Sequence, residues 1–124
     1  MKNTVDELRI LSLNGLLGYG FSLDSLEEGM KTYPHFIGVD AGSSDPGPYY
    51  LGSGKSLTKK LQVKRDLELS IESAIKAKIP FVIGSAGTSG GKPHLRFTEE
   101  IIKEIAKEKK LSLKLAIIHA DIDK

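Results

Sequence analysis

Short runs of apolar residues alternate along the chain with segments in which apolar residues recur every three or four positions. Four runs, at residues 8–13, 36–39, 81–83 and 113–118, are predicted to be strands. Each run is nearly all apolar, which is typical of strands that are buried on both faces of a parallel sheet. The first run ends abruptly in Asn14, so the chain is expected to leave the sheet there.

Apolar residues spaced by three and four predict helices between these strands. The spacing after the capping candidate Ser22 marks one face of a short helix that ends near Tyr33. Two longer helices are expected over 57–78 and 98–109, because each segment carries one apolar stripe. The stripes are Val63, Leu67, Ile71, Ala74 and Ile75 in the first segment and Ile101, Ile102, Ile105 and Ala106 in the second.

The alternation of four strands with three helices predicts the fold class. Helical connections between strands favour an α/β fold with a parallel sheet. We therefore expect residues 1–124 to form a single domain on a four-stranded, mostly parallel sheet with helices on its faces, like half of a flavodoxin-like or Rossmann-like fold. No helix is expected after 113–118, so either a partner chain covers the exposed sheet or the chain is the front segment of a longer protein.

Glycine-rich stretches follow the first and third predicted strands. Ligands of open parallel sheets bind outside the carboxyl ends of the strands, where neighbouring crossovers leave in opposite directions. If the strand order is 2-1-3-4, residues 15–20 and 84–91 would flank one crevice. Gly18, in the first stretch, is therefore a candidate ligand-binding residue.

The stretch 84–91 combines glycines with three hydroxyl side chains shortly before a helix. Glycines allow positive φ and close backbone approach, and such loops cradle anions. Gly84, Ser85, Gly87 and Thr88 are therefore candidates for binding an anionic group. The glycine spacing is not that of the dinucleotide-binding fingerprint, and a simple turn of small residues explains the same composition.

The loop expected after the second strand is longer than an ordinary connection, which favours a functional or mobile segment. Residues 52–56, Gly-Ser-Gly-Lys-Ser, imitate the end of a Walker A loop. The full motif fails, because Tyr49 stands where it requires glycine, so hydrolysis of a nucleoside triphosphate is not predicted. Ser43, Gly54 and Lys55 are retained as candidates for holding a phosphate or a carboxylate.

Ionisable side chains near the predicted strand ends are the candidates for catalysis. They are Asp40 and Asp45 after the second strand, His94 after the third and His119 after the fourth. Carboxylates and imidazoles act as general acids and bases, or gather a divalent metal. No tight ligand spacing such as HExxH is present, so no metal ligands are assigned. Asp40 bonding loop amides and His94 satisfying a turn are equally good interpretations.

Composition and charge narrow the function classes. With 40% hydrophobic and 27% charged residues the chain resembles an ordinary soluble globular protein. The formal net charge is +2 and aromatic residues are few, so no nucleic-acid partner is expected. The absence of cysteine excludes disulfides, thiolate nucleophiles and cysteine-ligated zinc. No apolar stretch is long enough to span a bilayer, so no membrane partner is expected and the cytoplasm is the expected location.

Several segments carry a resemblance to a known family. Residues 40–54 read Asp-Ala-Gly-Ser-Ser-Asp-Pro-Gly-Pro-Tyr-Tyr-Leu-Gly-Ser-Gly, and residues 63–66 read Val-Lys-Arg-Asp. The likeness continues through Leu-Leu-Gly-Tyr-Gly-Phe at 16–21, Ile-Gly-Ser-Ala-Gly at 83–87, Pro-His-Leu at 93–95 and Ile-His-Ala at 118–120. Together these segments resemble the amino-terminal part of the acyclic terpene utilisation family, the AtuA-like proteins.

The resemblance implies a link to the bacterial breakdown of acyclic terpenoids. Members of that family are usually several times longer, so this chain would correspond to a front segment. The resemblance supplies neither a settled reaction nor assigned catalytic residues.

Three functions fit these observations. The first is a site for a small molecule with a carboxylate, phosphate or acyl-thioester group, in which Asp40, Asp45, His94 or His119 act as acid or base. The second is a non-catalytic subunit or module that assembles into a homo-oligomer or with a partner subunit. The third is a metal-dependent hydrolase built from the same Asp and His residues. The sequence identifies no cofactor.

Overall fold

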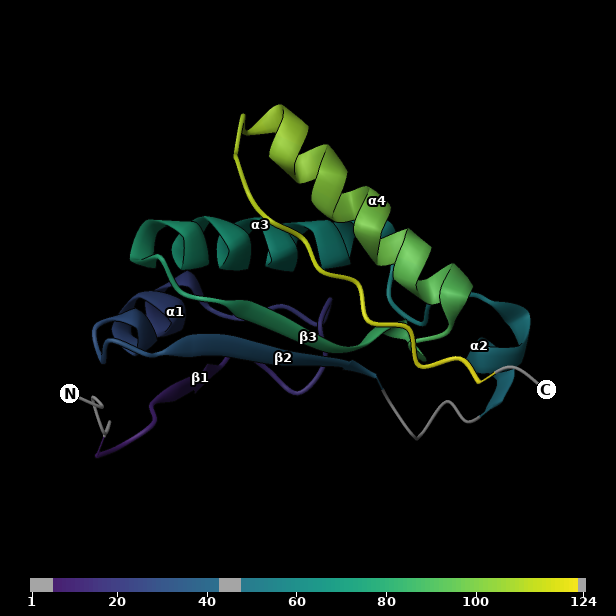
Figure 1. The fold of residues 1–124 in the computed structure, drawn as a ribbon, viewed down its shortest axis with the longest axis horizontal. Coiled ribbons are helices and arrows are strands. Elements are labelled where there is room, and N and C mark those ends of the chain that lie inside the picture. The colour runs from purple at the N-terminus through teal and green to yellow at the C-terminus, as the bar shows by residue number, and fades with distance from the viewer. Residues whose placement is uncertain (1–5, 43–47, 123–124) are drawn as a thin grey trace.

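The computed structural model describes residues 6–42 and 48–122. Along these residues three strands alternate with helices in an α/β arrangement (Figure 1). The strands are β1 (Ile10–Ser12), β2 (Phe36–Gly42) and β3 (Phe81–Thr88), and the helices are α1 (Leu23–Met30), α2 (Pro48–Ser53), α3 (Lys60–Ala77) and α4 (Lys92–Glu108).

The strands form one parallel sheet in the order β1-β2-β3. In the middle strand, Ile37 lies between Leu11 of β1 and Phe81 of β3. Strands that follow one another in the chain are therefore neighbours, as is common in such folds, and the order 2-1-3-4 is wrong. Because β2 separates β1 from β3, residues 15–20 and 84–91 do not flank a crevice between neighbouring strands.

The fourth strand predicted over 113–118 is not confirmed, because this segment pairs with no strand in the described part of the chain. It runs back beside α4 and β3 (Figure 1) and borders a groove of about 370 Å³ that Phe81 and Ile83 also line. Leu111 and Leu113 pack against the core. Apolar contact thus holds the segment beside the sheet without strand pairing in the described part of the chain.

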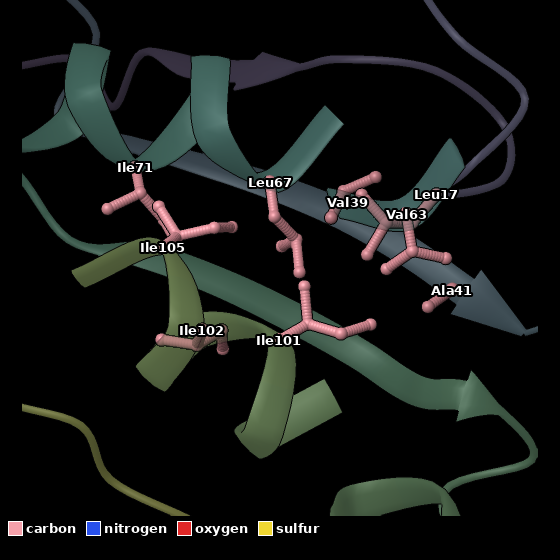
Figure 2. Packing of buried hydrophobic residues seen from close by; sticks show 9 residues of the cluster. All are labelled: Leu17, Val39, Ala41, Val63, Leu67, Ile71, Ile101, Ile102 and Ile105. Atoms are coloured by element: carbon pink, nitrogen blue, oxygen red, sulfur yellow. The ribbon is translucent and has the colours of Figure 1, made fainter. Parts of the chain in front are cut away.

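One face of the sheet carries the hydrophobic core. Val39 and Ala41 of β2 are buried on this face beneath α3 and α4. Figure 2 shows Leu67 of α3 and Ile101 of α4 pointing toward one another above the strands. The stripes predicted for the two long helices are largely confirmed, although Ile75 is exposed. The core cluster is Leu17, Val39, Ala41, Val63, Leu67, Ile71, Ile101, Ile102 and Ile105.

Local contacts explain where the helices begin. The Ser25 amide donates to the hydroxyl of Ser22, which caps α1 as predicted. The long helix α3 starts at Lys60 and not at 57, because Lys59 has an extended backbone and its amide donates to the Gln62 side chain in a capping box. The last helix starts well before residue 98, because Pro93 suits the first turn of a helix. The long loop expected after β2 also contains the short helix α2.

The helices cover one face of the sheet, whereas helices on both faces were expected. Leu11 contacts Gly29 of α1 on the same face as Ile37, the face that α3 and α4 cover. Connections that all advance in one direction across a sheet place their helices on one side. On the opposite face Ile10 is 54% exposed and Val82 is 53% exposed. This open face of the sheet also bears Asp40.

Ion pairs join α3 to α4 at their solvent side. The Glu104 carboxylate lies 2.6 Å from Lys60 Nζ and 2.7 Å from Lys64 Nζ. Hydrogen bonds from Lys60 and Lys64 lower the pKa of Glu104 to about 2. Hydrogen bonds to Glu104 and Glu108 raise the pKa of Lys64. The network therefore holds Glu104 charged at neutral and moderately acidic pH.

We expect this network to make the fold less stable as the solution becomes acidic. A carboxylate whose folded pKa is depressed contributes stability that is fully present above the unfolded pKa of 4.5 and is lost as the pH falls towards about 2. The free energy of unfolding should decline across that window, and the decline should be smaller in Glu104→Gln. Urea titrations at a series of pH values measure it. The exposed Glu100, changed to Gln, is the control, and a wild-type profile in Glu104→Gln would contradict the role of the network.

Candidate functional site

The pairing of β2 with β3 becomes irregular at the carboxyl edge of the sheet. Asp40 lies beside Gly84, and Gly42 lies beside Thr88, so β2 advances by two residues while β3 advances by four. The additional residues of β3 form a bulge that begins at Ser85. Bulges are frequent next to binding sites because they redirect side chains. The first half of the predicted loop is therefore a distorted strand.

The backbone of this bulge is strained. Ser85 has φ 49° and Thr88 has φ 90°, although neither residue is glycine. The left-handed region is unfavourable for residues with a Cβ, and most of all for a β-branched threonine. Such conformations persist where the surrounding contacts enforce them, and they gather at functional sites.

Asp40 and Ser85 bring a carboxylate and a hydroxyl together on the open face of the sheet. A Cβ built onto Gly42 would lie 3.1 Å from Asp40 Oδ1 and 2.8 Å from Ser85 Oγ, so both groups border the space above Gly42. Both residues are exposed. The Gly42 amide donates to Asp40 Oδ1 at 2.7 Å and orients the carboxylate. We refer to Asp40, Gly42, Gly84 and Ser85 as the strand-end site.

Thr88 holds the turn before α3 against the end of β3. Its buried hydroxyl accepts from the Leu57 amide at 2.8 Å and lies 3.1 Å from Ser56 Oγ. Ser56 Oγ in turn lies 3.2 Å from Thr58 Oγ1. These hydrogen bonds occupy the Thr88 hydroxyl, and they explain the strained conformation that the residue adopts.

His94 ties the segment around α2 to the first turn of α4. Its imidazole is 1% exposed, and Nε2 lies 2.8 Å from the Tyr50 carbonyl oxygen and 3.1 Å from that of Lys55. Because carbonyl oxygens only accept, Nε2 carries the proton. Gly87 packs so closely on His94 that an added Cβ would lie 2.6 Å from the His94 carbonyl oxygen. These contacts support the interpretation of His94 as a residue that satisfies a turn.

Asp66 is a residue that the sequence analysis did not single out as part of a site. It lies on the inner side of α3 with 0% of its surface exposed. Its Oδ2 accepts from the Gly18 amide at 2.9 Å and from the Gly20 amide at 3.0 Å, and Arg65 Nη1 donates to its Oδ1 at 2.8 Å. A carboxylate at a buried position of the predicted helical stripe was the signal that could have revealed it.

The predicted binding residues fall into an exposed and a buried group. Gly84, Ser85 and Lys55 are exposed. The others are buried or packed against the protein: the amide of Gly18 is bound to Asp66, Gly87 contacts His94, Thr88 binds Leu57, and Gly54 packs against Pro93.

The predicted catalytic residues are not all brought together. Asp40 belongs to the strand-end site, whereas His94 is buried between the segment around α2 and the first turn of α4. His119 is exposed on the segment that follows α4, and within the described ranges it has no hydrogen bond to the strand-end site. Asp45 and the binding candidate Ser43 lie outside the described residues. The roles of all these residues in catalysis stay predictions.

Residues 6–42 and 48–122 contain no group of three or more His, Cys, Asp or Glu side chains placed to hold a metal ion. No helix in those ranges has the length and apolar character needed to cross a bilayer.

No family model, no curated protein and no solved structure matches this chain.

We expect Asp66→Asn to destabilise the fold. The amide keeps the shape of the carboxylate, but its NH2 group faces donors where the carboxylate accepted, and breaking such a buried charged pair costs about 3 kcal/mol. Urea denaturation measures the loss. The matched control, Glu100→Gln on the exposed side of α4, should lie within about 0.5 kcal/mol of wild type. Equal stability of Asp66→Asn and wild type would show that the loop does not depend on this charge.

Proposed function

We propose that this chain binds a small molecule carrying a carboxylate, phosphate or acyl-thioester group at the strand-end site. The observation that carries the proposal is the exposed pair of Asp40 and Ser85, set around Gly42 on a strained bulge. A carboxylate and a hydroxyl at the carboxyl ends of parallel strands are positioned as ligand-binding groups usually are in α/β proteins.

The chemistry of these groups suggests how the ligand is held. The Ser85 hydroxyl both donates and accepts, so it can bond a carbonyl or a phosphoryl oxygen. Lys55, which is exposed on the turn fixed by His94, is the cation that we assign to an anionic ligand. Asp40, oriented by the Gly42 amide, serves as the acid or base of a reaction on the bound molecule.

The resemblance to the acyclic terpene utilisation family supports the same proposal. Its longest segment, residues 40–54, begins at Asp40, and a second segment, 83–87, contains Ser85. Two segments that carry the resemblance therefore each contribute one side chain of the strand-end site. On this basis we propose that the ligand is an acyl compound from the breakdown of acyclic terpenoids. Hydrolysis with a bound metal has weaker support, since no three metal-ligating side chains meet in the described ranges.

We expect Asp40→Asn to raise the affinity of the strand-end site for an anionic ligand while leaving the fold intact, because the exposed carboxylate that repels the anion becomes neutral. Asparagine keeps the oxygen that accepts from the Gly42 amide but loses the charge, so the free energy of unfolding should change by less than about 1 kcal/mol. Titrations of the ¹⁵N-labelled protein with acetate, phosphate and acetyl-coenzyme A measure binding. In wild type, at least one of these should shift the amide signals of Gly42, Gly84 and Ser85 saturably.

Asp24→Asn, at an exposed carboxylate of α1, is the matched control and should bind as wild type does. The proposal fails if none of the three compounds moves the strand-end signals, or if Asp40→Asn binds with unchanged affinity. A large loss of stability in Asp40→Asn would show that the carboxylate serves the turn and not a ligand.

A second function, assembly into a homo-oligomer, is favoured by a separate observation. The open face exposes Ile10 and Val82, and large apolar side chains are also exposed on the segment after α4, among them Ile118 and Ile122. Large apolar side chains exposed on a sheet face are typical of surfaces that meet a partner. Assembly and ligand binding are compatible, because the strand-end site occupies only the end of the open face.

We expect light scattering to give a solution mass of at least twice that of one chain. Val82→Lys places a charge on the open face, so it should shift the protein towards the monomer. Leu61→Lys is the control, since Leu61 is an exposed apolar residue of α3 away from that face. A monomeric wild type, or an equal response to both substitutions, would rule out assembly through the open face.

A further inference from the structure

A pocket lies on the helical side of the sheet, around Arg65. It is an open hollow of about 350 Å³ between the loop after β1 and the first turns of α3. That volume is in the range of pockets that hold small organic ligands. The residues that line it are Gly18, Tyr19, Gly20, Phe21, Gln62, Arg65 and Asp66.

The guanidinium of Arg65 is fixed in this pocket by three contacts. Nη1 donates to Asp66 Oδ1 at 2.8 Å, and Nη2 donates to the Phe21 carbonyl oxygen at 2.8 Å. The guanidinium also lies over the Phe21 ring, 5.0 Å from its centroid. A guanidinium has five N–H groups, so these two hydrogen bonds leave donors for a ligand. The side chain is 46% exposed, so those donors are accessible from solvent.

The positive charge of Arg65 is only partly neutralised by Asp66. The buried Asp66 carboxylate is shared among the guanidinium and the amides of Gly18 and Gly20, and Asn14 Nδ2 approaches it at 3.5 Å. No other acidic side chain lines the pocket in the described part of the chain. A preorganised guanidinium whose counter-ion is buried and shared in this way retains attraction for an incoming anion.

The neighbouring side chains complete a ligand site. The Gln62 side-chain oxygen accepts from the Lys59 amide at 3.1 Å, so its Nε2 is the end that offers donors to the pocket. Tyr19 lines the same pocket and is 69% exposed, which leaves its ring available to cover an apolar group. Gly18 and Gly20 both have positive φ, so the loop can curl around Asp66 and present Tyr19 outward.

We propose that the Arg65 pocket binds a small organic anion, a carboxylate or a phosphate ester, through Arg65 and Gln62, with the apolar part of the ligand against Tyr19. This pocket is separate from the strand-end site, because α3 covers one face of the sheet and Asp40 belongs to the other. The inference does not rest on the function proposed above, since neither Asp40 nor Ser85 lines the pocket.

The arginine side chains provide a direct test by NMR. The chain has three arginines, Arg9, Arg65 and Arg96, and each gives its own Nε–H signal. Titration of the ¹⁵N-labelled protein with inorganic phosphate, and separately with propionate, should shift the Arg65 signal and the Tyr19 amide saturably with one dissociation constant. The signals of Arg9 and Arg96 should move little and without saturation. Equal movement of all three signals, or none at Arg65, would overturn the proposal.

Arg65→Lys tests whether binding needs the guanidinium group itself or only its positive charge. Lysine keeps the positive charge but loses the fixed fork of donors, so the probe anion should bind about tenfold more weakly. The amide signals of Gly18 and Gly20 report whether the loop has kept its fold. Unchanged affinity with those signals in place would refute the role of Arg65. Should the loop signals be lost, Gln62→Leu with Arg65 intact must weaken binding for the proposal to stand.

Asp40→Asn distinguishes this inference from the proposed function. It should leave phosphate and propionate binding at Arg65 unchanged, even where it changes the affinity measured at Gly84 and Ser85. Shifts at Arg65 alone would support the pocket and contradict the strand-end site. Shifts at Gly84 and Ser85 alone would support the strand-end site and contradict the Arg65 pocket.

Discussion

The structure at the carboxyl ends of the strands depends on the buried carboxylate of Asp66. A charge with no exposed surface must be compensated by donors, and here two backbone amides of the loop after β1 and the Arg65 guanidinium supply them. That loop contributes Leu17 to the core and bonds the carbonyl of Asp40 through the Leu17 amide. One side chain of α3 therefore connects the first loop to the end of the middle strand.

The same principle recurs at two further positions. Thr88 binds the turn before α3 through its hydroxyl, and His94 binds the carbonyl oxygens of Tyr50 and Lys55 through its imidazole. Each buried polar side chain thus holds one irregular segment, which cannot satisfy its backbone groups through regular secondary structure. Asp40 and Ser85 are exposed beside these segments, which buried hydrogen bonds hold in place.

The sequence predicted the fold class and the apolar faces of the long helices, because both follow from periodic burial. It did not predict the strand order, since apolar runs specify that strands are buried but not which ones pair. The run at 113–118 is as apolar as a strand, yet its contacts place it across a groove. Among the residues of the strand-end site, Asp40 and Ser85 were predicted from their positions after the expected strands, and their functional roles stay predictions. Asp66 was hidden within a helical stripe and is recognisable only from its contacts.

The single-sided covering of the sheet has an evolutionary consequence. Consecutive residues of β2 point to opposite faces, so Val39 and Ala41 face a close-packed interior while Asp40 faces outward. Substitutions at Val39 and Ala41 are limited by the volume of the packed interior. Substitutions at Asp40 are not limited in this way, because its side chain is on the open face. Neighbouring codons in one short strand are therefore expected to diverge at different rates among descendants of this sequence, because close packing restrains only every second position.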